Sequence, residues 1–437
     1  MKFQVPKGCR DFYPAEMRVR KWLFDRWRRT SIRNGFEEYD GPIFESLDLY
    51  RAKSGDQIVS ELFHFVDRGD REFALRPEMT PTLARMVAAR AQSLPKPIRW
   101  FSMPRLCRAE RPQRGRLREF FQWNVDIVGE DQPIADAECI FVMIDFLRDV
   151  GLSPEQVVLK INSRHLVVAI LQSEGFAEEQ MAPVLAALDK RDRLSADAFA
   201  EHVGGLGVND AQREALINLG GAAGPAGLER IGKLAGDSSE GRQAWATLTE
   251  IFALLASMGV ADYCTFDMGV VRGLAYYTGV VFEAFGRGGL QRAICGGGRY
   301  DRLVSDLGGP PMGGVGFATS DVVMLDVLSE FNLLPDAAEP RGLFVIDATP
   351  ECFDRVLRLT GELRRRNYPA IYSFKRQPLH KQIKQAVARR AARVIVVEEP
   401  DASAGHVAVK DLDAGLQRSI TVESMLADPY QSLEDGS

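Results

Sequence analysis

Several features that would place the sequence in a specialised class of protein are scarce or missing. There are only six cysteines among 437 residues, and they are scattered without a C-x-x-C pair. This usage argues against a zinc site or a disulfide framework and is typical of a reducing cytoplasm. No apolar run reaches transmembrane length, and the first residues, MKFQVPKGCRDFYP, contain no signal-peptide core. We therefore expect a cytoplasmic protein with no membrane association and no zinc.

The charge balance also lacks a strong bias. The net charge of -5 does not indicate a nucleic-acid-binding protein, although local basic patches rather than the total decide such binding. The apolar content of 46% and charged content of 26% are those of an ordinary globular protein. At this length the chain is expected to form two or three domains.

The most informative stretch runs from Phe101 to Gly129 and is predicted to form a strand, a charged connection and a second strand. Between Leu106 and Phe120 lie five arginines within about a dozen residues. An ordinary hairpin turn is short and rich in Asn, Gly or Asp. A long arginine-rich connection instead indicates a loop that closes over an anion, because the planar guanidinium matches phosphate oxygens. The alternative is a solvated, charged hairpin tip.

Further polar residues follow in patterns that suit a site. Gln122, Asn124 and Asp126 share one face of the second strand, so they point either to solvent or into a site. Glu78 and Thr80 lie in a proline-bounded turn before a helix, where they could simply cap that helix. A buried ammonium group, however, needs an ionised partner, and a carboxylate such as Glu78 is the natural one.

The charged hairpin carries a resemblance to a known family. The run Arg108-x-Glu110-Arg111-Pro112-Gln113-Arg114-Gly115-Arg116-x-Arg118-x-Phe120-x-Gln122 resembles motif 2 of class II aminoacyl-tRNA synthetases, and most closely that of histidyl-tRNA synthetases. The resemblance implies that Arg108 holds the amino acid carboxylate and the ATP α-phosphate. It also implies that Glu110 reads the adenine amino group, that Phe120 stacks on the adenine, and that Arg116 belongs to the ATP site.

Two other motifs imply a histidine pocket. Leu75-Arg76-Pro77-Glu78-Met79-Thr80 resembles a family motif whose glutamate takes the α-amino group of histidine, and Met79 stands where that motif usually has glycine. The resemblance places Glu78, Met79 and Thr80 beside histidine, together with Gln122 and Asp126. Asp126 stands where glutamate is common, so its contact could shift or pass through water.

The second half of the chain resembles the same family. Arg272-Gly-Leu-Ala-Tyr276-Tyr277-Thr-Gly is similar to the histidine-specific motif, with alanine in place of an aspartate. By themselves the two tyrosines could be a core residue and a surface residue. The resemblance implies that Arg272 stabilises charge during catalysis, and that Tyr276, Tyr277 and Tyr300 form walls of the histidine site. Tyrosine rings can flank an imidazole, while hydroxyl groups and a carboxylate can form hydrogen bonds with its nitrogens.

One departure from the family concerns motif 3. The run Gly313-Gly-Val-Gly316-Phe317-Ala318 resembles its start, but the usual arginine position falls on Val323. That arginine ordinarily meets the ATP γ-phosphate. Some branches of the family resemble this chain in carrying Asp-Val where others carry Glu-Arg. Our hypothesis is that Arg116, Arg118 or Arg302 supplies the missing charge.

The resemblance and the changes in periodicity together predict the organisation of the chain. We expect an α/β protein with an α+β core, in which a class II-type antiparallel sheet is flanked by helices. A helix over 15–34 and a strand over 36–43 resemble motif 1, which forms a dimer interface in the family. The final segment alternates strands and helices, which predicts a mostly parallel sheet. The expected divisions are a core in two parts (1–164 and 261–332), a helical insertion (165–260), a linker (333–341) and an anticodon-binding-like α/β domain (342–430).

The resemblance implies a histidine–tRNA ligase. Its substrates would be histidine, ATP with Mg²⁺ and the tRNA for histidine, and it would act as a homodimer. A non-catalytic paralog, such as the regulatory subunit of ATP phosphoribosyltransferase, is the alternative that the altered motif 3 favours. The C-terminal domain disfavours it, because those paralogs usually lack one. A plain RNA-binding module is a third possibility, because a basic surface can read RNA loops.

Overall fold

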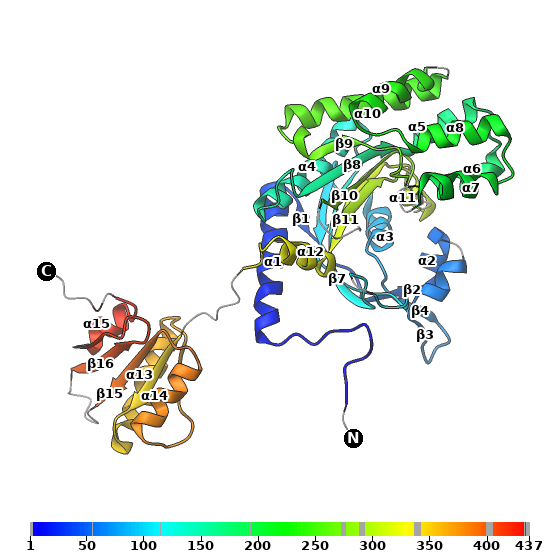
Figure 1. Ribbon diagram of the computed structural model, residues 1–437. Helices are drawn as coiled ribbons and strands as arrows, with labels where there is room; N and C mark the ends of the chain where they lie inside the picture. Colours follow the sequence, from blue (N-terminus) through cyan, green and yellow to red (C-terminus); the bar gives the residue numbers. More distant parts are fainter. Residues whose placement is uncertain are drawn as a thin grey trace. The chain divides into compact units, whose positions relative to one another are not determined.

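The chain divides into two compact units, residues 1–335 and 336–437, which we describe separately. The computed structural model (Figure 1) describes residues 3–54, 56–113, 115–189, 191, 194–236, 238–271, 277–287, 293–335, 342–398, 405–431 and 433.

The first unit is built on a nine-stranded sheet in the order β1-β5-β7-β12-β11-β10-β8-β9, with β6 paired to β7. Every pairing from β5 to β8 is antiparallel, and only the two edge pairs, β1 with β5 and β8 with β9, are parallel. The expected antiparallel sheet is therefore confirmed. Its strands are β1 (Glu37–Glu38), β5 (Ile98–Ser102), β6 (Arg105–Cys107), β7 (Glu119–Val128), β8 (Val157–Ser163), β9 (Cys264–Phe266), β10 (Val280–Gly286), β11 (Ala293–Arg299) and β12 (Gly314–Ser320).

One face of this sheet is buried under helices. Helices α1 (Pro14–Arg33) and α4 (Pro133–Asp149) cover β7, and aromatic side chains fill the space between them. The ring of Trp123 on β7 lies 6.1 Å from that of Trp27 on α1 and 5.1 Å from that of Phe146 on α4. Helix α1 ends as its sequence predicts, because Gly35 follows it with a φ of +78°, a conformation that favours glycine.

The helical segment after β8 shares this core with the sheet. Its first helix and its last helix contribute Leu166, Ile170, Leu248 and Ile251 to the same buried cluster as Trp123. Figure 1 shows α9 and α10 beside β8 and β9, in agreement with their contacts. The helices are α5 (Arg164–Ser173), α6 (Glu178–Asp189), α7 (Ala196–Gly204), α8 (Asp210–Gly220), α9 (Gly224–Ala235) and α10 (Ser239–Ser257).

A smaller sheet follows the first helix in the chain. Strands β2 (Phe44–Ser46) and β3 (His64–Val66) flank β4 (Glu72–Leu75), and α2 (Leu47–Ser54) connects β2 to the rest. The strand predicted over 36–43 was wrong in its extent. The chain forms strands only at β1 and again from Phe44, and in the stretch between them Arg76 donates to the carboxylate of Asp40 and the carbonyl of Gly41.

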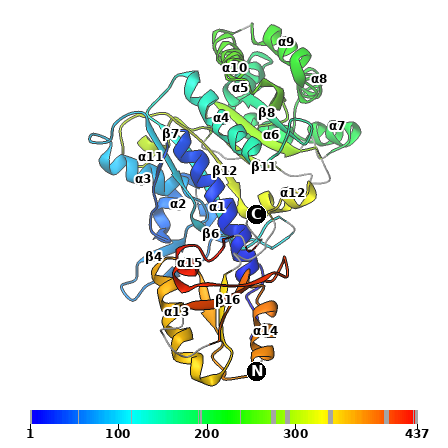
Figure 2. The same ribbon diagram turned by 90° about the vertical axis from the view of Figure 1, so that its left-hand side faces the viewer.

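The second unit is a five-stranded mixed sheet, so the prediction of a mostly parallel sheet was wrong. Its order is β14-β13-β15-β16-β17, with two parallel pairs followed by two antiparallel ones. Helices α13 and α15 share one core cluster and α14 shares the other, so they cover opposite faces; Figure 2 shows α13 and α14 on opposite sides of the strands. The elements are β13 (Leu343–Asp347), α13 (Phe353–Arg365), β14 (Ala370–Tyr372), α14 (Leu379–Ala388), β15 (Arg393–Val397), β16 (His406–Asp411), β17 (Gln417–Thr421) and α15 (Val422–Ala427).

Among the helices of the described residues, none combines the length and the apolar character needed to cross a lipid bilayer.

Candidate active site

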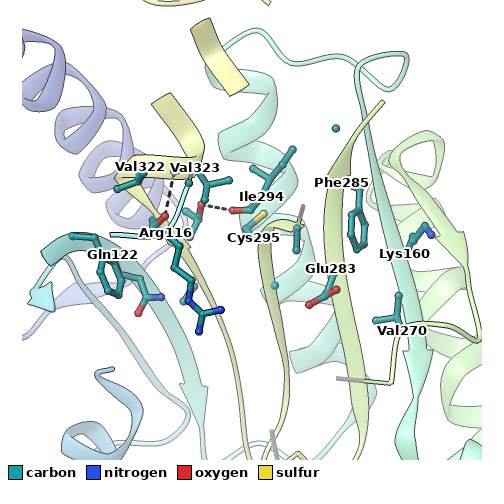
Figure 3. A pocket seen from close by; sticks show the side chains of 18 of the residues that line it. Arg116, Gln122, Lys160, Val270, Glu283, Phe285, Ile294, Cys295, Val322 and Val323 are labelled. Carbon is teal, nitrogen blue, oxygen red and sulfur yellow. Dashed lines mark hydrogen bonds between the residues drawn. The ribbon is translucent and has the colours of Figure 1, made fainter. Parts of the chain in front are cut away.

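A pocket of about 1400 Å³ lies on the face of the large sheet that α1 and α4 leave uncovered. In Figure 3, Arg116 and Gln122 lie on one side of it and Lys160, Glu283 and Phe285 on the other. The described residues that line it are Arg108, Gln113, Gly115, Arg116, Leu117, Phe120, Gln122, Val158, Lys160, Gly269, Val270, Glu283, Phe285, Gly286, Arg287, Ala293, Ile294, Cys295, Gly296, Ala318, Thr319, Ser320, Val322 and Val323.

Small residues form the floor of this pocket. Gly296 on β11 pairs in register with Ala318 on β12, and the neighbouring strands place Glu283 and Asn124 at the two ends of the same row. Because side chains on one face of a sheet lie in such rows, the centre of the floor is backbone and methyl, whereas its edges are polar. A flat ligand can therefore lie against the sheet while polar groups reach it from both sides.

The lining of the pocket is cationic. Its described residues include four basic side chains, those of Arg108, Arg116, Lys160 and Arg287, and one carboxylate, that of Glu283. Opposite charge and guanidinium donors favour a polyanion such as a phosphate chain in this space.

Arg108 connects the two predicted halves of the site. Its Nε donates to the carbonyl of Pro77 at 3.0 Å, which brings it to the turn that carries Glu78. Its guanidinium carbon also lies 5.0 Å from the centre of the Phe120 ring. The Arg108 side chain therefore stands between the turn predicted to bind an amino group and the ring predicted to stack on adenine.

The tip of the hairpin is fixed by its own charges. Glu110 forms an ion pair with Arg116, and the Nε of Arg118 donates to the carbonyl of Glu110 at 3.1 Å. Arg116 lines the pocket, whereas Glu110, Arg118 and Arg302 are not among the described lining residues. Of the three arginines considered as substitutes for the motif 3 arginine, Arg116 thus shares a pocket with Val323.

A buried polar cluster adjoins the pocket at the far end of β7. The hydroxyl of Tyr300 donates to Asp126 at 2.7 Å, and both side chains are buried. Burial raises the pKa of Asp126 to about 7, and the hydrogen bond from Tyr300 opposes that rise. Only glycine fits opposite, because a Cβ added at Gly316 would lie 2.0 Å from the Asp126 carboxylate. A second tyrosine, Tyr277, is buried in the same core cluster as Tyr300.

The turn before α3 (Thr80–Arg90) orients the remaining predicted residues. Met79 occupies the N-cap position and makes no side-chain capping bond, which disfavours the simple capping role for Glu78 and Thr80. Glu78 and Thr80 are half-buried. Met79 is fully buried beside Arg76, with its sulfur 3.8 Å from an Arg76 nitrogen, and it does not line the pocket.

Two predicted residues, Arg272 and Tyr276, lie outside the described residues. Those that the structure brings around the pocket are Arg108, Arg116, Phe120 and Gln122, and those in the adjoining buried cluster are Met79, Asp126, Tyr277 and Tyr300.

One contact near the site was missed by the sequence reasoning. Asp321, the first residue of α12 (Asp321–Glu330), is fully buried and accepts the N–H of Phe121 at 2.9 Å. Its charge is balanced by Arg10, whose Nη2 lies 2.7 Å away. The carbonyl of Gly8 accepts the N–H of Arg118 at 2.9 Å. The N-terminal segment therefore holds the hairpin and motif 3 together, and the only sequence signal was a carboxylate inside an apolar run.

The fold and the site define the class of protein. The solved histidyl-tRNA synthetase from Nostoc sp. PCC 7120 matches with a TM-score of 0.83, covering 98% of this chain and 99% of that chain, at 23% identity. At that identity the likeness shows the fold. The antiparallel sheet, the arginine-rich connection between β6 and β7, and the β12–α12 pair are those of a class II aminoacyl-tRNA synthetase.

The chain belongs to the histidyl-tRNA synthetase family, whose sequence model matches residues 8–321. It is 38% identical to the histidine–tRNA ligase of Opitutus terrae over 436 residues, which cover 97% of each protein. It is 36% identical to the chloroplastic/mitochondrial histidine–tRNA ligase of Arabidopsis thaliana, over 96% of this chain and 85% of that protein. A solved protein from Bacillus halodurans C, described as an ATP phosphoribosyltransferase regulatory subunit/histidyl-tRNA synthetase, is 26% identical, with a TM-score of 0.76, over 91% of this chain and 99% of that chain.

The ionisation of the buried Asp126 carboxyl group should make the stability of the protein depend on pH. Its pKa of about 7 lies above that of an unfolded chain, about 3.9, so the folded protein binds this proton more tightly. The group therefore contributes stability at low pH that is lost as pH rises toward 7. Asp126→Asn cannot ionise, so its melting temperature should rise relative to that of the wild type as pH increases from about 4 to about 7, as measured by circular dichroism. Asp306→Asn, at an exposed carboxylate, is the control. A difference between Asp126→Asn and wild type that does not change with pH would contradict the assignment.

Proposed function

We propose that this chain is a catalytic histidine–tRNA ligase that forms histidyl-adenylate and transfers the histidyl group to tRNA. The observation that carries the proposal is the position of Arg108, between the Glu78 turn and the Phe120 ring, at the edge of a pocket with four cations and one carboxylate. Family membership supports the same reaction, because the relatives with 34–38% identity over nearly the whole chain are named histidine–tRNA ligases.

In the first step, a carboxylate oxygen of histidine attacks the α-phosphorus of ATP, and pyrophosphate leaves. Arg108 holds the carboxylate and the α-phosphate, so it orients the two reactants and stabilises the negative charge that grows on the phosphorus. The family resemblance assigns Arg272 to the stabilisation of the same charge. In the second step, a hydroxyl at the 3′ end of tRNA attacks the histidyl carbonyl carbon, and AMP leaves.

Histidine selection is assigned to the turn before α3 and the buried end of β7. Glu78 receives the α-ammonium group, with Met79 and Thr80 shaping the turn. Asp126 and Tyr300, already hydrogen-bonded to each other, offer a carboxyl group and a hydroxyl group to the imidazole nitrogens. Gln122, Tyr276 and Tyr277 complete the walls. A site of this kind rejects side chains that leave its polar groups unpaired.

The nucleotide is assigned to the hairpin side of the pocket. Phe120 stacks on the adenine and Arg116 meets the phosphates. Glu110 is expected to read the adenine amino group, which requires its ion pair with Arg116 to rearrange. The Mg²⁺ that the family uses would be held mainly by phosphate oxygens, and Glu283 is a lining carboxylate that fits such an ion. The metal neutralises phosphate charge when it is bound.

The regulatory paralog is the less supported function. Val323 favours it, because an aliphatic side chain lines the pocket where the family usually has arginine. The compact C-terminal unit and the higher identity to ligases oppose it. We assign tRNA binding in part to that unit, and we assign the protein to the cytoplasm, because all six of its cysteines are free thiols.

Histidine-dependent exchange of pyrophosphate into ATP tests the proposal directly. The wild-type protein should catalyse it, and it should then charge tRNA with histidine. Glu78→Gln keeps the size of the side chain and removes its charge, so kcat/KM for histidine should fall at least about hundredfold. Histidine binding without exchange would establish the regulatory alternative, and neither binding nor exchange would contradict both.

Arg116 should substitute for the motif 3 arginine. Its loss removes a charged hydrogen-bond donor worth about 1.5–3 kcal/mol, so Arg116→Ala should raise KM for ATP about ten- to hundredfold in the exchange assay. Arg302→Ala is the matched control and should leave KM near the wild-type value, while Arg118→Ala tests the remaining arginine of the hypothesis. Three unimpaired variants would end the hypothesis.

We further propose that the protein is a homodimer that uses the small sheet as part of its interface. Phe44, Phe65 and Phe73 pack edge to face or tilted at 5.4–5.8 Å between ring centres, yet Phe44 and Phe65 stay exposed. A contiguous apolar patch of this kind is typical of a protein interface.

A charge inside this patch should separate the subunits. Phe65→Glu replaces an apolar side chain worth about 1.5–3 kcal/mol at both symmetric positions, so the dimer dissociation constant should rise about hundredfold or more. Light scattering after size-exclusion chromatography measures the mass. Leu357→Glu, which is at an exposed position in the second unit, is the control. A wild-type monomer, or a Phe65→Glu protein with unchanged mass, would exclude this interface.

A further inference from the structure

Phe374 is a strongly exposed aromatic residue in the second unit. It lies in the loop between β14 and α14 with 85% of its surface accessible, and the edge of Tyr372 is its ring neighbour at 5.5 Å. A single exposed apolar side chain needs no explanation in general. The surroundings of this ring, however, are unusually well fixed for a surface loop.

Hydrogen bonds hold the loop on both sides of Phe374. The buried hydroxyl of Ser373 donates to the carbonyl of Lys375 at 2.9 Å and accepts from Gln377 at 3.1 Å. Arg376 donates to Asp347 at 3.0 Å and to the carbonyl of Pro350 at 2.9 Å, and its guanidinium lies 3.8 Å from the Phe353 ring centre. The backbone is therefore pinned while the Phe374 ring points away, so little conformational entropy is lost when a ligand covers the ring.

The loop also occupies a recognised kind of binding position in an α/β sheet. β13 and β14 are parallel neighbours, and the helices that follow them, α13 and α14, pack on opposite faces. The strand order reverses between β13 and β15, and in such folds ligands bind beyond the carboxyl ends of the parallel strands at this point. Phe374 follows the carboxyl end of β14, and Arg376 in the same loop binds Asp347, the last residue of β13.

The segment that carries the ring has charges of one sign only. Residues 373–390 contain six lysines and arginines and no acidic residue. All six side chains are exposed: Lys375, Arg376, Lys381, Lys384, Arg389 and Arg390. A planar aromatic surface set among exposed cations matches a nucleic-acid strand with an unstacked base, because the cations follow the backbone and the ring takes the base.

We propose that Phe374 is a stacking platform for an unpaired base of the bound tRNA, with the basic residues of 375–390 holding the adjacent phosphates. This inference rests on the proposed function for the identity of the RNA. It assigns a specific contact to the second unit, whereas the pocket that performs the chemistry belongs to the first unit. Stacking accepts any base, so Phe374 contributes affinity, and hydrogen bonds elsewhere must read sequence.

The test separates tRNA binding from adenylate formation. Base stacking on an aromatic ring is worth enough that Phe374→Ala should raise KM for tRNA about tenfold in aminoacylation. The kcat and the histidine-dependent pyrophosphate exchange should stay at wild-type values. Phe374→Trp keeps a stacking surface and should restore KM. Val387→Ala, which removes an exposed apolar side chain from α14, is the matched control and should have no effect.

A second measurement keeps the test independent of catalysis. Binding of a fluorescent RNA hairpin with a single-stranded loop should weaken in Phe374→Ala, whereas binding of a fully paired RNA duplex should not change. An acceptor-stem minihelix, which lacks the loop, should be charged equally by both proteins.

The proposal is overturned if Phe374→Ala binds the looped hairpin as wild type does, or if it impairs charging of the minihelix to the same extent. Unchanged RNA affinity with loss of a protein partner would assign the ring to a protein contact. Absence of pyrophosphate exchange in the wild type would contradict the proposed function, while the hairpin measurement would still decide the role of Phe374.

Discussion

The first unit depends on a single strand, β7, whose two faces lie in different environments. On one face of β7, Trp123 and its odd-numbered neighbours are sealed under α1 and α4 by aromatic packing. On the other face, Gln122 opens to the pocket and Asp126 is buried against Tyr300. Because the side-chain period of a strand is two, a slip by one residue would exchange these sets and bury the polar side chains under the helices. The aromatic packing thus fixes the register that directs Gln122, Asn124 and Asp126 to the face opposite the helices.

The same strand links the two kinds of chemistry that the proposed reaction needs. Its hairpin end carries cations and an exposed face for a nucleotide, and its far end carries a buried carboxyl group suited to a small polar side chain. Between them, beside Asn124, the floor on β12 and β11 is alanine and glycine, so a ligand can extend across it without meeting a bulky side chain. The separation explains how one site can be open and charged at one end and closed and selective at the other. Desolvation at the closed end is also what raises the pKa of Asp126.

The sequence predicted those features of this arrangement that depend on residues close together in the chain. The alternation from Phe120 to Val128 predicted β7, and the cluster of arginines predicted a long charged connection before it, whose binding of an anion stays a prediction. The pairing of Arg10 with Asp321 could not be predicted, because the partners are 311 residues apart and neither has a distinctive neighbourhood in the sequence. The ion pair of Glu110 with Arg116 was missed for another reason. The loop contains several arginines, and the sequence does not indicate which of them Glu110 contacts. In the C-terminal unit the strand positions were predictable but their direction was not, because an apolar strand such as β16 can pair either way.

The contact of Arg10 with Asp321 has a consequence for the folding of the enzyme during its synthesis. Arg10 leaves the ribosome early, but the carboxylate that it pairs with is made only after most of the first unit has emerged. The N-terminal segment that contacts the arginine hairpin therefore cannot form its ion pair with Asp321 until the large sheet and the helical segment have been synthesised. Nascent chains that stop short of α12 would carry every arginine of the hairpin and still lack the brace. In such truncated chains the hairpin would be left without the support that motif 3 provides, so assembly of the nucleotide side of the pocket is coupled to the last element of the unit.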